Sequence, residues 1–175
     1  MEKVQHHTVT LNCDPHKAFE LFTRNEHLEK WLTVEADVEP KAGGKYELFW
    51  NPSDKENDST IGCRVTTFVQ DRLLGFDWKG PLEYKDVMND ADPLTLVSVF
   101  FLPVEAEDGL RTVVHLIHSG WRSAPEWEDP WKYFDNAWAL CFKRLDQYVN
   151  EGVVPPDWHP RTNQGTGSAF EKEAS

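Results

Sequence analysis

The sequence predicts an α+β protein in which a curved antiparallel sheet wraps around one long C-terminal helix. Two observations support this prediction. Residues 94–104 and 110–119 are apolar runs joined by the short acidic segment 105–109, a pattern typical of a long β-hairpin. Between residues 131 and 149, apolar residues recur at intervals of three, four and seven, which is the spacing of an amphipathic helix.

The N-terminal part predicts a strand, two short helices and a second strand. Residues 4–12 mix threonines with apolar residues, as strands do. Asp14 and Pro15 are a helix cap followed by a proline suited to the first turn, so a helix of about two turns should follow. Residues 25–32 predict the second helix and residues 33–39 the next strand, which should end before the turn at Gly43 and Gly44.

The middle of the chain predicts the remaining strands. We expect strands at residues 45–51, 60–70 and 73–79, a polar loop at 52–59, and irregular segments at 80–93 and 120–130. Gly152 fits the C-cap of the last helix. We therefore expect one domain over residues 1–151 and a poorly ordered tail over 152–175, within which Trp158 could still dock on the domain. In the strand 60–70, one face should carry Ile61, Cys63, Val65 and Thr67.

Charge and cysteine content exclude several classes of function. A net charge of -12 opposes binding to nucleic acid or to anionic membranes. No apolar run reaches the ~20 residues that span a bilayer, and the first residues do not look like a signal peptide. The three widely spaced cysteines form no CxxC pair and predict neither a disulfide framework nor a metal site. We expect a cytoplasmic protein without a cofactor.

Three stretches resemble a known family. They are Ala18–Phe22 followed by Trp31; Gly43–Tyr46 with Ile61-Gly62 and Phe76-Asp77-Trp78; and His118-Ser119-Gly120-Trp121 leading into residues 131–145. Over residues 4–151 the chain is similar to the homologues of the Hsp90 ATPase activator, in the superfamily that contains START domains and the Bet v 1 allergen. The resemblance implies a helix-grip fold, with the long helix across the opening of the sheet. It implies no single activity, because relatives bind hydrophobic ligands, act as cyclases or aromatases, or dock on chaperones.

An apolar cavity between the sheet and the last helix is the candidate site. Phe134, Trp138 and Phe142 should face the sheet, either as ordinary core or as the wall of a pocket of ~300–1,000 Å³. The sheet residues that face the helix are predicted from alternate positions along each strand. An error of one residue in the register of a strand would replace all its predicted inward residues by their neighbours. The predicted sheet residues are Tyr46, Leu48, Trp50, Val65, Phe76, Trp78, Val99, Phe101, Val114, Leu116 and His118.

The polar groups within this set leave their roles open. His118 is a satisfied structural histidine, a polar anchor for a ligand, or a general base. Tyr46 is a second candidate for the polar anchor. Nothing in the spacing of Glu47, Arg64, Asp77 and Tyr84 makes them converge as acid and base groups. His6 and His7 are adjacent and should point to opposite faces of a strand.

The sequence therefore favours binding of a small hydrophobic or aromatic molecule over catalysis. One alternative is a protein-interaction module associated with a chaperone. This sequence starts at the first strand, without the extra N-terminal domain that the resemblance would imply for this role, and we expect the role to be less favoured for that reason. A second alternative is an enzyme of cyclase or hydrolase type. We expect a monomer or a homodimer, in which the aromatic loop 120–130 could form the contact. The resemblance further associates the chain with lipid binding and the stress response.

Overall fold

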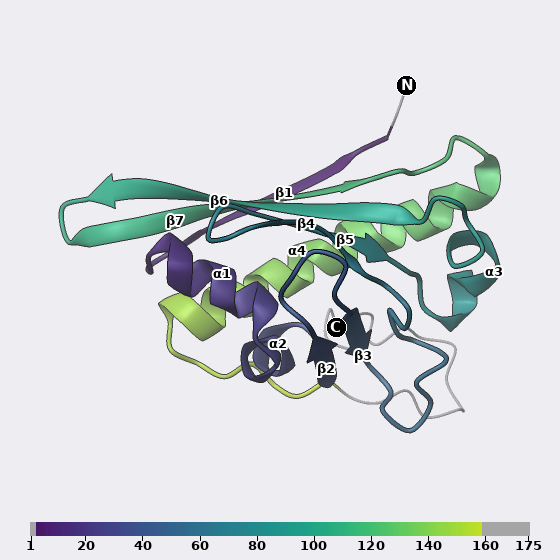
Figure 1. The fold of residues 1–175 in the computed structure, drawn as a ribbon, viewed down its shortest axis with the longest axis horizontal. Helices are drawn as coiled ribbons and strands as arrows, with labels where there is room; N and C mark the ends of the chain where they lie inside the picture. Colours follow the sequence, from purple (N-terminus) through teal and green to yellow (C-terminus); the bar gives the residue numbers. More distant parts are fainter. Residues whose placement is uncertain (1–2, 159–175) are drawn as a thin grey trace.

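The computed structural model describes residues 3–158, and its elements follow the predicted order. Figure 1 shows the long hairpin, the short helices near the N-terminus and the long C-terminal helix. The strands are β1 (Gln5–Leu11), β2 (Glu35–Val38), β3 (Tyr46–Phe49), β4 (Val65–Val69), β5 (Leu73–Trp78), β6 (Thr95–Ala106) and β7 (Gly109–Ser119). The helices are α1 (Pro15–Thr23), α2 (Asn25–Trp31), η1 (Leu82–Tyr84), α3 (Lys85–Met88), η2 (Pro125–Trp127) and α4 (Glu128–Asn150).

The main sheet has five strands in the order β1-β7-β6-β5-β4, and every neighbouring pair is antiparallel. β2 and β3 form a separate antiparallel pair. A bridge between Lys45 and Arg64 links this pair to the segment before β4, so the chain continues the curve of the sheet there. The predicted helix-grip fold is confirmed, because α4 packs along the inner side of this sheet (Figure 1).

Local chemistry fixes the ends of the predicted helices. Asp14 caps α1 through its Oδ1, which accepts a hydrogen bond from the Lys17 amide at 2.9 Å, and Pro15 follows it. Just beyond α4, Gly152 has a φ of +65°, the left-handed conformation that ends many helices. Both expected boundary signals therefore act as predicted.

Several local expectations were wrong. The strand predicted over 60–70 begins only at Val65, because residues 60–64 form a turn in which Gly62 has a φ of +83°. An irregularity between Val65 and Thr67 then shifts the register. Consequently Val65 points inward but Thr67 points outward, although alternation had placed both on one face. The segments 80–93 and 120–130 contain short helices, and α4 starts three residues earlier than expected, at Glu128.

The core lies between the inner face of the sheet and the apolar side of α4. Phe134, Trp138 and Phe142 of α4 are buried there, and the ring of Trp138 lies 4.9 Å from that of Trp78 on β5. Polar contacts fix the same helix to β1: Gln5 donates to the Trp131 carbonyl at 2.6 Å, and His7 bonds Asp135 at 3.0 Å. The aromatic stripe of α4 therefore faces the hollow of the sheet, as the fold requires.

Candidate ligand-binding site

The residues predicted to line a cavity all point into the space between the sheet and α4. Each is buried except Trp50, which is half-buried. For these residues the alternation along the strands gave the right face, although it failed for Thr67 of β4. Burial alone does not make these residues a ligand site, so their binding role stays a prediction. The set comprises Tyr46, Leu48, Trp50, Val65, Phe76, Trp78, Val99, Phe101, Val114, Leu116, His118, Phe134, Trp138 and Phe142.

Aromatic rings fill most of the space in which a cavity was expected. Tyr46 stacks on Phe76 with ring centroids 3.8 Å apart, and Phe101 packs edge-on against Phe22 at 5.4 Å. Such close ring contacts are typical of a protein core packed at crystal density. A cavity of ~300–1,000 Å³, the size that would enclose a drug-like ligand, is therefore not confirmed among the described residues.

A smaller, partly open pocket lies where the loop after β3, the end of β5 and the start of α4 meet. Its cavity volume is about 30 Å³. Its surface is almost entirely apolar. We call it the aromatic pocket; it is lined by Trp50, Asn51, Asp58, Ser59, Trp78, Lys79, Gly80, Pro81, Tyr133 and Phe134.

Only part of this lining was predicted from the sequence. Trp50, Trp78 and Phe134 were expected, whereas the pocket residues from the loops and Tyr133 were not. Tyr133 precedes Phe134 on α4 and was omitted because it lies at the border of the apolar stripe. The signal that could have revealed the loop residues was Gly80-Pro81 directly after the strand that ends at Trp78, since such a pair turns the chain over the end of the sheet.

The polar groups around the aromatic pocket are mostly committed to the backbone. The Lys79 ammonium donates to the Ile61 carbonyl at 2.6 Å, and the Asp58 carboxylate accepts from the Leu82 amide at 3.0 Å. Ser59 donates from its hydroxyl to the Lys55 carbonyl at 2.5 Å. These bonds hold the three loops together and leave apolar walls facing the pocket.

Trp78 differs from these groups. Its side chain is 2% exposed, and its indole Nε1 is buried with no hydrogen-bond partner within residues 3–158. An unpaired buried donor costs about 1–3 kcal/mol relative to a satisfied one. Gln5 Oε1 and Trp131 Nε1 are also unpaired, but neither residue lines the aromatic pocket. Among the residues that line the aromatic pocket, Trp78 thus carries an unpaired buried donor.

His118 is a satisfied structural histidine in this structure. Its Nδ1 accepts from the Trp138 indole at 3.1 Å, because an indole nitrogen can only donate. Nδ1 therefore carries no proton, and Nε2–H donates to the Thr95 hydroxyl at 2.9 Å. Complete burial lowers the pKa of His118 to about 3, so the ring is neutral. With both nitrogens engaged by protein groups, nothing favours the anchoring or general-base role.

Tyr46 is occupied in the same way. Its hydroxyl donates to the Phe22 carbonyl at 2.8 Å, and burial raises the pKa of the phenol. The acid and base groups considered from the sequence also have separate surroundings. Glu47 accepts from the Gly62 amide at 3.0 Å, whereas the ring of Tyr84 packs on Tyr133. The geometry around these groups therefore offers no support for an acid–base pair.

Aromatic loop residues close the end of the core near His118. Trp121 is 6% exposed and donates from its indole to the His118 carbonyl at 3.1 Å. Its ring meets that of Trp127 edge-on, with centroids 6.2 Å apart. Both tryptophans are therefore buried plugs of the core, and the loop 120–130 exposes little of its aromatic surface.

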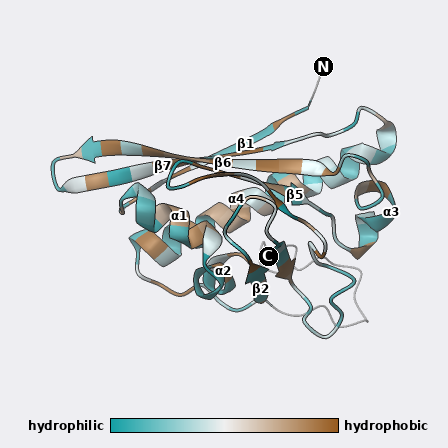
Figure 2. Cartoon of the chain, in the orientation of Figure 1, coloured by the Kyte–Doolittle hydropathy of each residue, from teal (hydrophilic) through white to brown (hydrophobic). Residues whose placement is uncertain are grey.

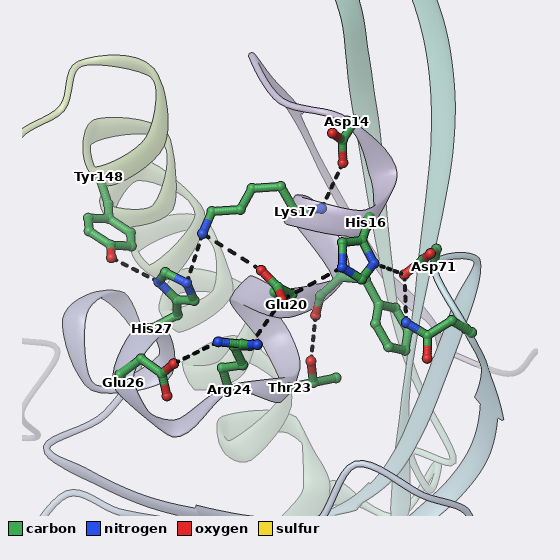
Figure 3. A network of polar contacts seen from close by, with 12 residues as sticks. Asp14, His16, Lys17, Glu20, Thr23, Arg24, Glu26, His27, Asp71 and Tyr148 are labelled. Carbon is green, nitrogen blue, oxygen red and sulfur yellow. Dashed lines mark hydrogen bonds and ion pairs between the residues drawn. The ribbon is translucent and has the colours of Figure 1, made fainter.

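A second group of titratable residues joins α1, α2, α4 and the turn between β4 and β5 (Figure 3). Glu20 lies 3.0 Å from the Arg24 guanidinium and 3.7 Å from His16, whose pKa is raised by its bond to Asp71. His27 accepts from the Lys17 ammonium at 3.0 Å and contacts Tyr148. Because its charges pair with one another near the surface, this group ties the helices together and offers no free reactive side chain.

Residues 3–158 hold no group of three or more histidine, cysteine or acidic side chains that could bind a metal ion. His6 and His7 do point to opposite faces, His6 toward His115 and His7 toward α4. Over the same residues no helix is long and apolar enough to cross a bilayer.

The model of the family described as activator of Hsp90 ATPase homolog 1-like protein matches residues 12–150. The chain belongs to this family. A comparison with curated proteins gives no match. Sequence alone had identified the family from stretches in the same region, so that recognition is confirmed.

Solved structures of family type share the fold. A protein from Mesorhizobium loti is 18% identical with a TM-score of 0.66, over 87% of this chain and 100% of that one. The Aha1 dimer from Colwellia psychrerythraea is 19% identical with a TM-score of 0.64, over 86% and 98%. A structure described as an Hsp90 activator from Plasmodium falciparum is 17% identical with a TM-score of 0.61, over 83% and 94%. At these identities the similarity concerns the fold alone.

Proposed function

We propose that this protein binds small aromatic molecules that carry a hydrogen-bond acceptor, and that it binds them at the aromatic pocket. The unpaired indole Nε1 of Trp78 is the observation that carries the proposal. Apolar walls favour a ring, and the buried donor favours a carbonyl, ether or ring nitrogen on that ring. Binding needs no cofactor in this proposal.

The small volume of the aromatic pocket sets the size and pose of such a ligand. A space of about 30 Å³ is far below the ~150 Å³ of a cavity that encloses benzene. The ligand would therefore insert one edge beside Trp78 and keep the rest of its ring between Trp50 and Tyr133 at the opening. A large lipid or a polycyclic compound would require the packed rings of the core to rearrange.

Acetophenone is a suitable probe, because it joins one aromatic ring to one carbonyl acceptor. We expect saturable shifts of the Trp78 indole signal in a ¹H–¹⁵N spectrum, with that signal assigned through Trp78→Phe. Tyr133→Ala should weaken binding by about three- to tenfold, since an aromatic contact contributes about 0.5–1.5 kcal/mol. Tyr148→Ala is the matched control, because Tyr148 is also a half-buried tyrosine on α4 but does not line the pocket.

Two outcomes would count against ligand binding at this pocket. The first is an indole spectrum that stays unchanged up to millimolar acetophenone. The second is equal weakening by Tyr133→Ala and Tyr148→Ala, which would point to a general loss of stability instead of the loss of a pocket wall.

The second candidate function is a chaperone-associated interaction module. It is favoured by the family to which the chain belongs and by the similar fold of the Plasmodium falciparum protein described as an Hsp90 activator. The measurement that decides is the ATPase rate of purified Hsp90 with and without an excess of this protein. An unchanged rate, together with no co-sedimentation, would remove this candidate.

A cytoplasmic location is part of the proposal. It is supported by the cysteines Cys13, Cys63 and Cys141, which form no disulfide bond within the described residues, as expected in a reducing compartment. Fractionation of cells that express the tagged chain would test this location directly.

A further inference from the structure

The outer face of the five-stranded sheet is uncovered. α1 and α4 pack on the inner face, α2 packs against these two helices, and no described helix lies on the opposite side in Figure 1. Paired residues of adjacent strands share a face, so the register identifies the outward side chains. We define the outer face by these residues: His6, Thr8 and Thr10 of β1; Thr67 and Val69 of β4; Leu73, Gly75 and Asp77 of β5; Leu96, Ser98, Phe100, Leu102 and Val104 of β6; and Arg111, Val113, His115, Ile117 and Ser119 of β7.

Apolar side chains form a continuous band on this face. Val69 pairs with Leu73, which pairs with Phe100 on β6, and this row crosses three strands. One step along β6, Leu102 pairs with Val113 of β7. Phe100 and Leu102 of β6 are 38% and 48% exposed. Figure 2 shows hydrophobic stretches along this strand. Large exposed apolar patches of this kind usually mark an interaction site.

The outer face is also almost free of the charge that dominates the rest of the protein. The chain has 30 acidic residues and a net charge of -12. Among the outward strand residues defined above, Asp77 is the only carboxylate and Arg111 the only guanidinium, which forms an ion pair with Asp108 in the turn between β6 and β7. The remaining polar side chains on this face are histidines and short hydroxyl residues.

We infer that the outer face binds a second copy of this chain, sheet against sheet, in a two-fold symmetric dimer centred on Phe100 and Leu102. Two copies with strong negative charge repel each other wherever their acidic surfaces meet. Contact between identical chains is therefore tolerated at a face without net charge. A basic partner would instead be drawn to the acidic surfaces elsewhere on the molecule.

The size of the face fits such a dimer. Five strands spaced about 4.8 Å apart are roughly 24 Å wide, and strands of about eight residues are roughly 27 Å long, which gives a footprint of roughly 650 Å². A standard interface buries about 800 Å² on each partner. The exposed end of the β6–β7 hairpin, including Val104, adds area beyond the other strands. A two-fold axis would place the same residues of both copies against each other.

Sedimentation equilibrium of the full chain tests this inference. We expect the wild type to dimerise at tens of micromolar in 0.5 M NaCl and more weakly at 0.02 M, because salt screens the repulsion between acidic chains. Leu102→Glu should raise the dimer dissociation constant at least tenfold. Leu82→Glu should leave it unchanged, because Leu82 is 53% exposed on η1 and lies off the outer face.

Thr8→Glu provides a second variant that removes no apolar side chain. It places a carboxylate on exposed β1 of the same face and should weaken the dimer even if Leu102→Glu fails to fold. A wild type that is monomeric at 200 µM in 0.5 M NaCl overturns the inference and leaves the outer face to a different protein. A dimer that Leu102→Glu and Thr8→Glu leave unchanged overturns it as well, because contact then lies elsewhere.

Discussion

Replacing single tryptophans by phenylalanine should separate a satisfied indole from an unsatisfied one. Trp138 donates from its indole to His118 at 3.1 Å, whereas Trp78 has no partner for its indole within the described residues. Both side chains are 2% exposed and their rings touch, so the two substitutions remove the same atoms from the same part of the core. The difference between them therefore reports mainly on hydrogen bonding.

The expected difference follows from the two indole environments. Trp138→Phe leaves the His118 Nδ1 buried without a donor, which costs about 1–3 kcal/mol beyond the lost ring volume. Trp78→Phe removes an unpaired buried donor and so regains about 1–3 kcal/mol against the same loss of volume. The free energy of unfolding should therefore be roughly 2–6 kcal/mol lower for Trp138→Phe than for Trp78→Phe.

Urea unfolding followed by circular dichroism measures this difference, provided that the two variants give equal m-values. Trp31→Phe serves as a further reference, because the Trp31 indole donates to the Leu21 carbonyl at 2.9 Å and should behave like Trp138. Equal losses of stability for Trp78→Phe and Trp138→Phe would refute the reasoning. They would mean that water or another group satisfies the Trp78 indole in the free protein, and the acceptor-bearing ligand would lose its main support.

Three further predictions concern titration, thiol reactivity and a helix end. Because the pKa of His118 is about 3 in the folded protein and ~6.5 when unfolded, unfolding takes up a proton between these values. The contribution of His118 to the free energy of unfolding is therefore complete above pH 6.5 and declines by up to ~1.4 kcal/mol per pH unit below that value. His118→Gln should flatten the measured pH dependence of stability. Equal slopes for the variant and the wild type would contradict the low pKa of His118. Burial raises the pKa of Cys13 to about 11 and that of Cys63 to about 12. Both thiols of the native protein should therefore react with Ellman's reagent at pH 8 far more slowly than those of the protein unfolded in urea. Rapid labelling of the native protein would show that these thiols are not shielded. Gly152→Ala should lower the free energy of unfolding in urea by about 1–2 kcal/mol, the cost of a left-handed backbone for alanine. No further cost is expected, because no atom lies within 4 Å of the added Cβ. A much larger loss would reveal a steric contact that the structure lacks.

The sequence predicted the fold well because its strongest signals are periodic. The alternation along β6 and β7 correctly placed Val99, Phe101 and Val114 inside, and the helical repeat placed Phe134 and Trp138 opposite them. Where an irregularity interrupts the period, alternation fails, and Thr67 was assigned to the wrong face of β4 for this reason.

The candidate site was less predictable, because it depends on volumes and on loops. Periodicity shows which way Tyr46 and Phe76 point, but it cannot show that their rings stack at 3.8 Å and leave no cavity between them. The aromatic pocket is shaped by loop residues such as Asp58, whose φ of +49° and bond to Leu82 have no periodic signal. The partners of His118 come from β6 and α4, distant in sequence, so its neutral form follows only from the structure.

The chain beyond α4 also determines where the folded unit should be cut for expression. Trp158 is 4% exposed and lies over the Arg144 guanidinium at 3.9 Å, while Arg144 donates to the Trp31 carbonyl at 3.0 Å. A shortened version that stops at the end of α4 would remove the Trp158 indole and expose the Arg144 guanidinium that it covers. Shortened versions for crystallisation, or fusions to a reporter, should therefore retain the sequence through Trp158.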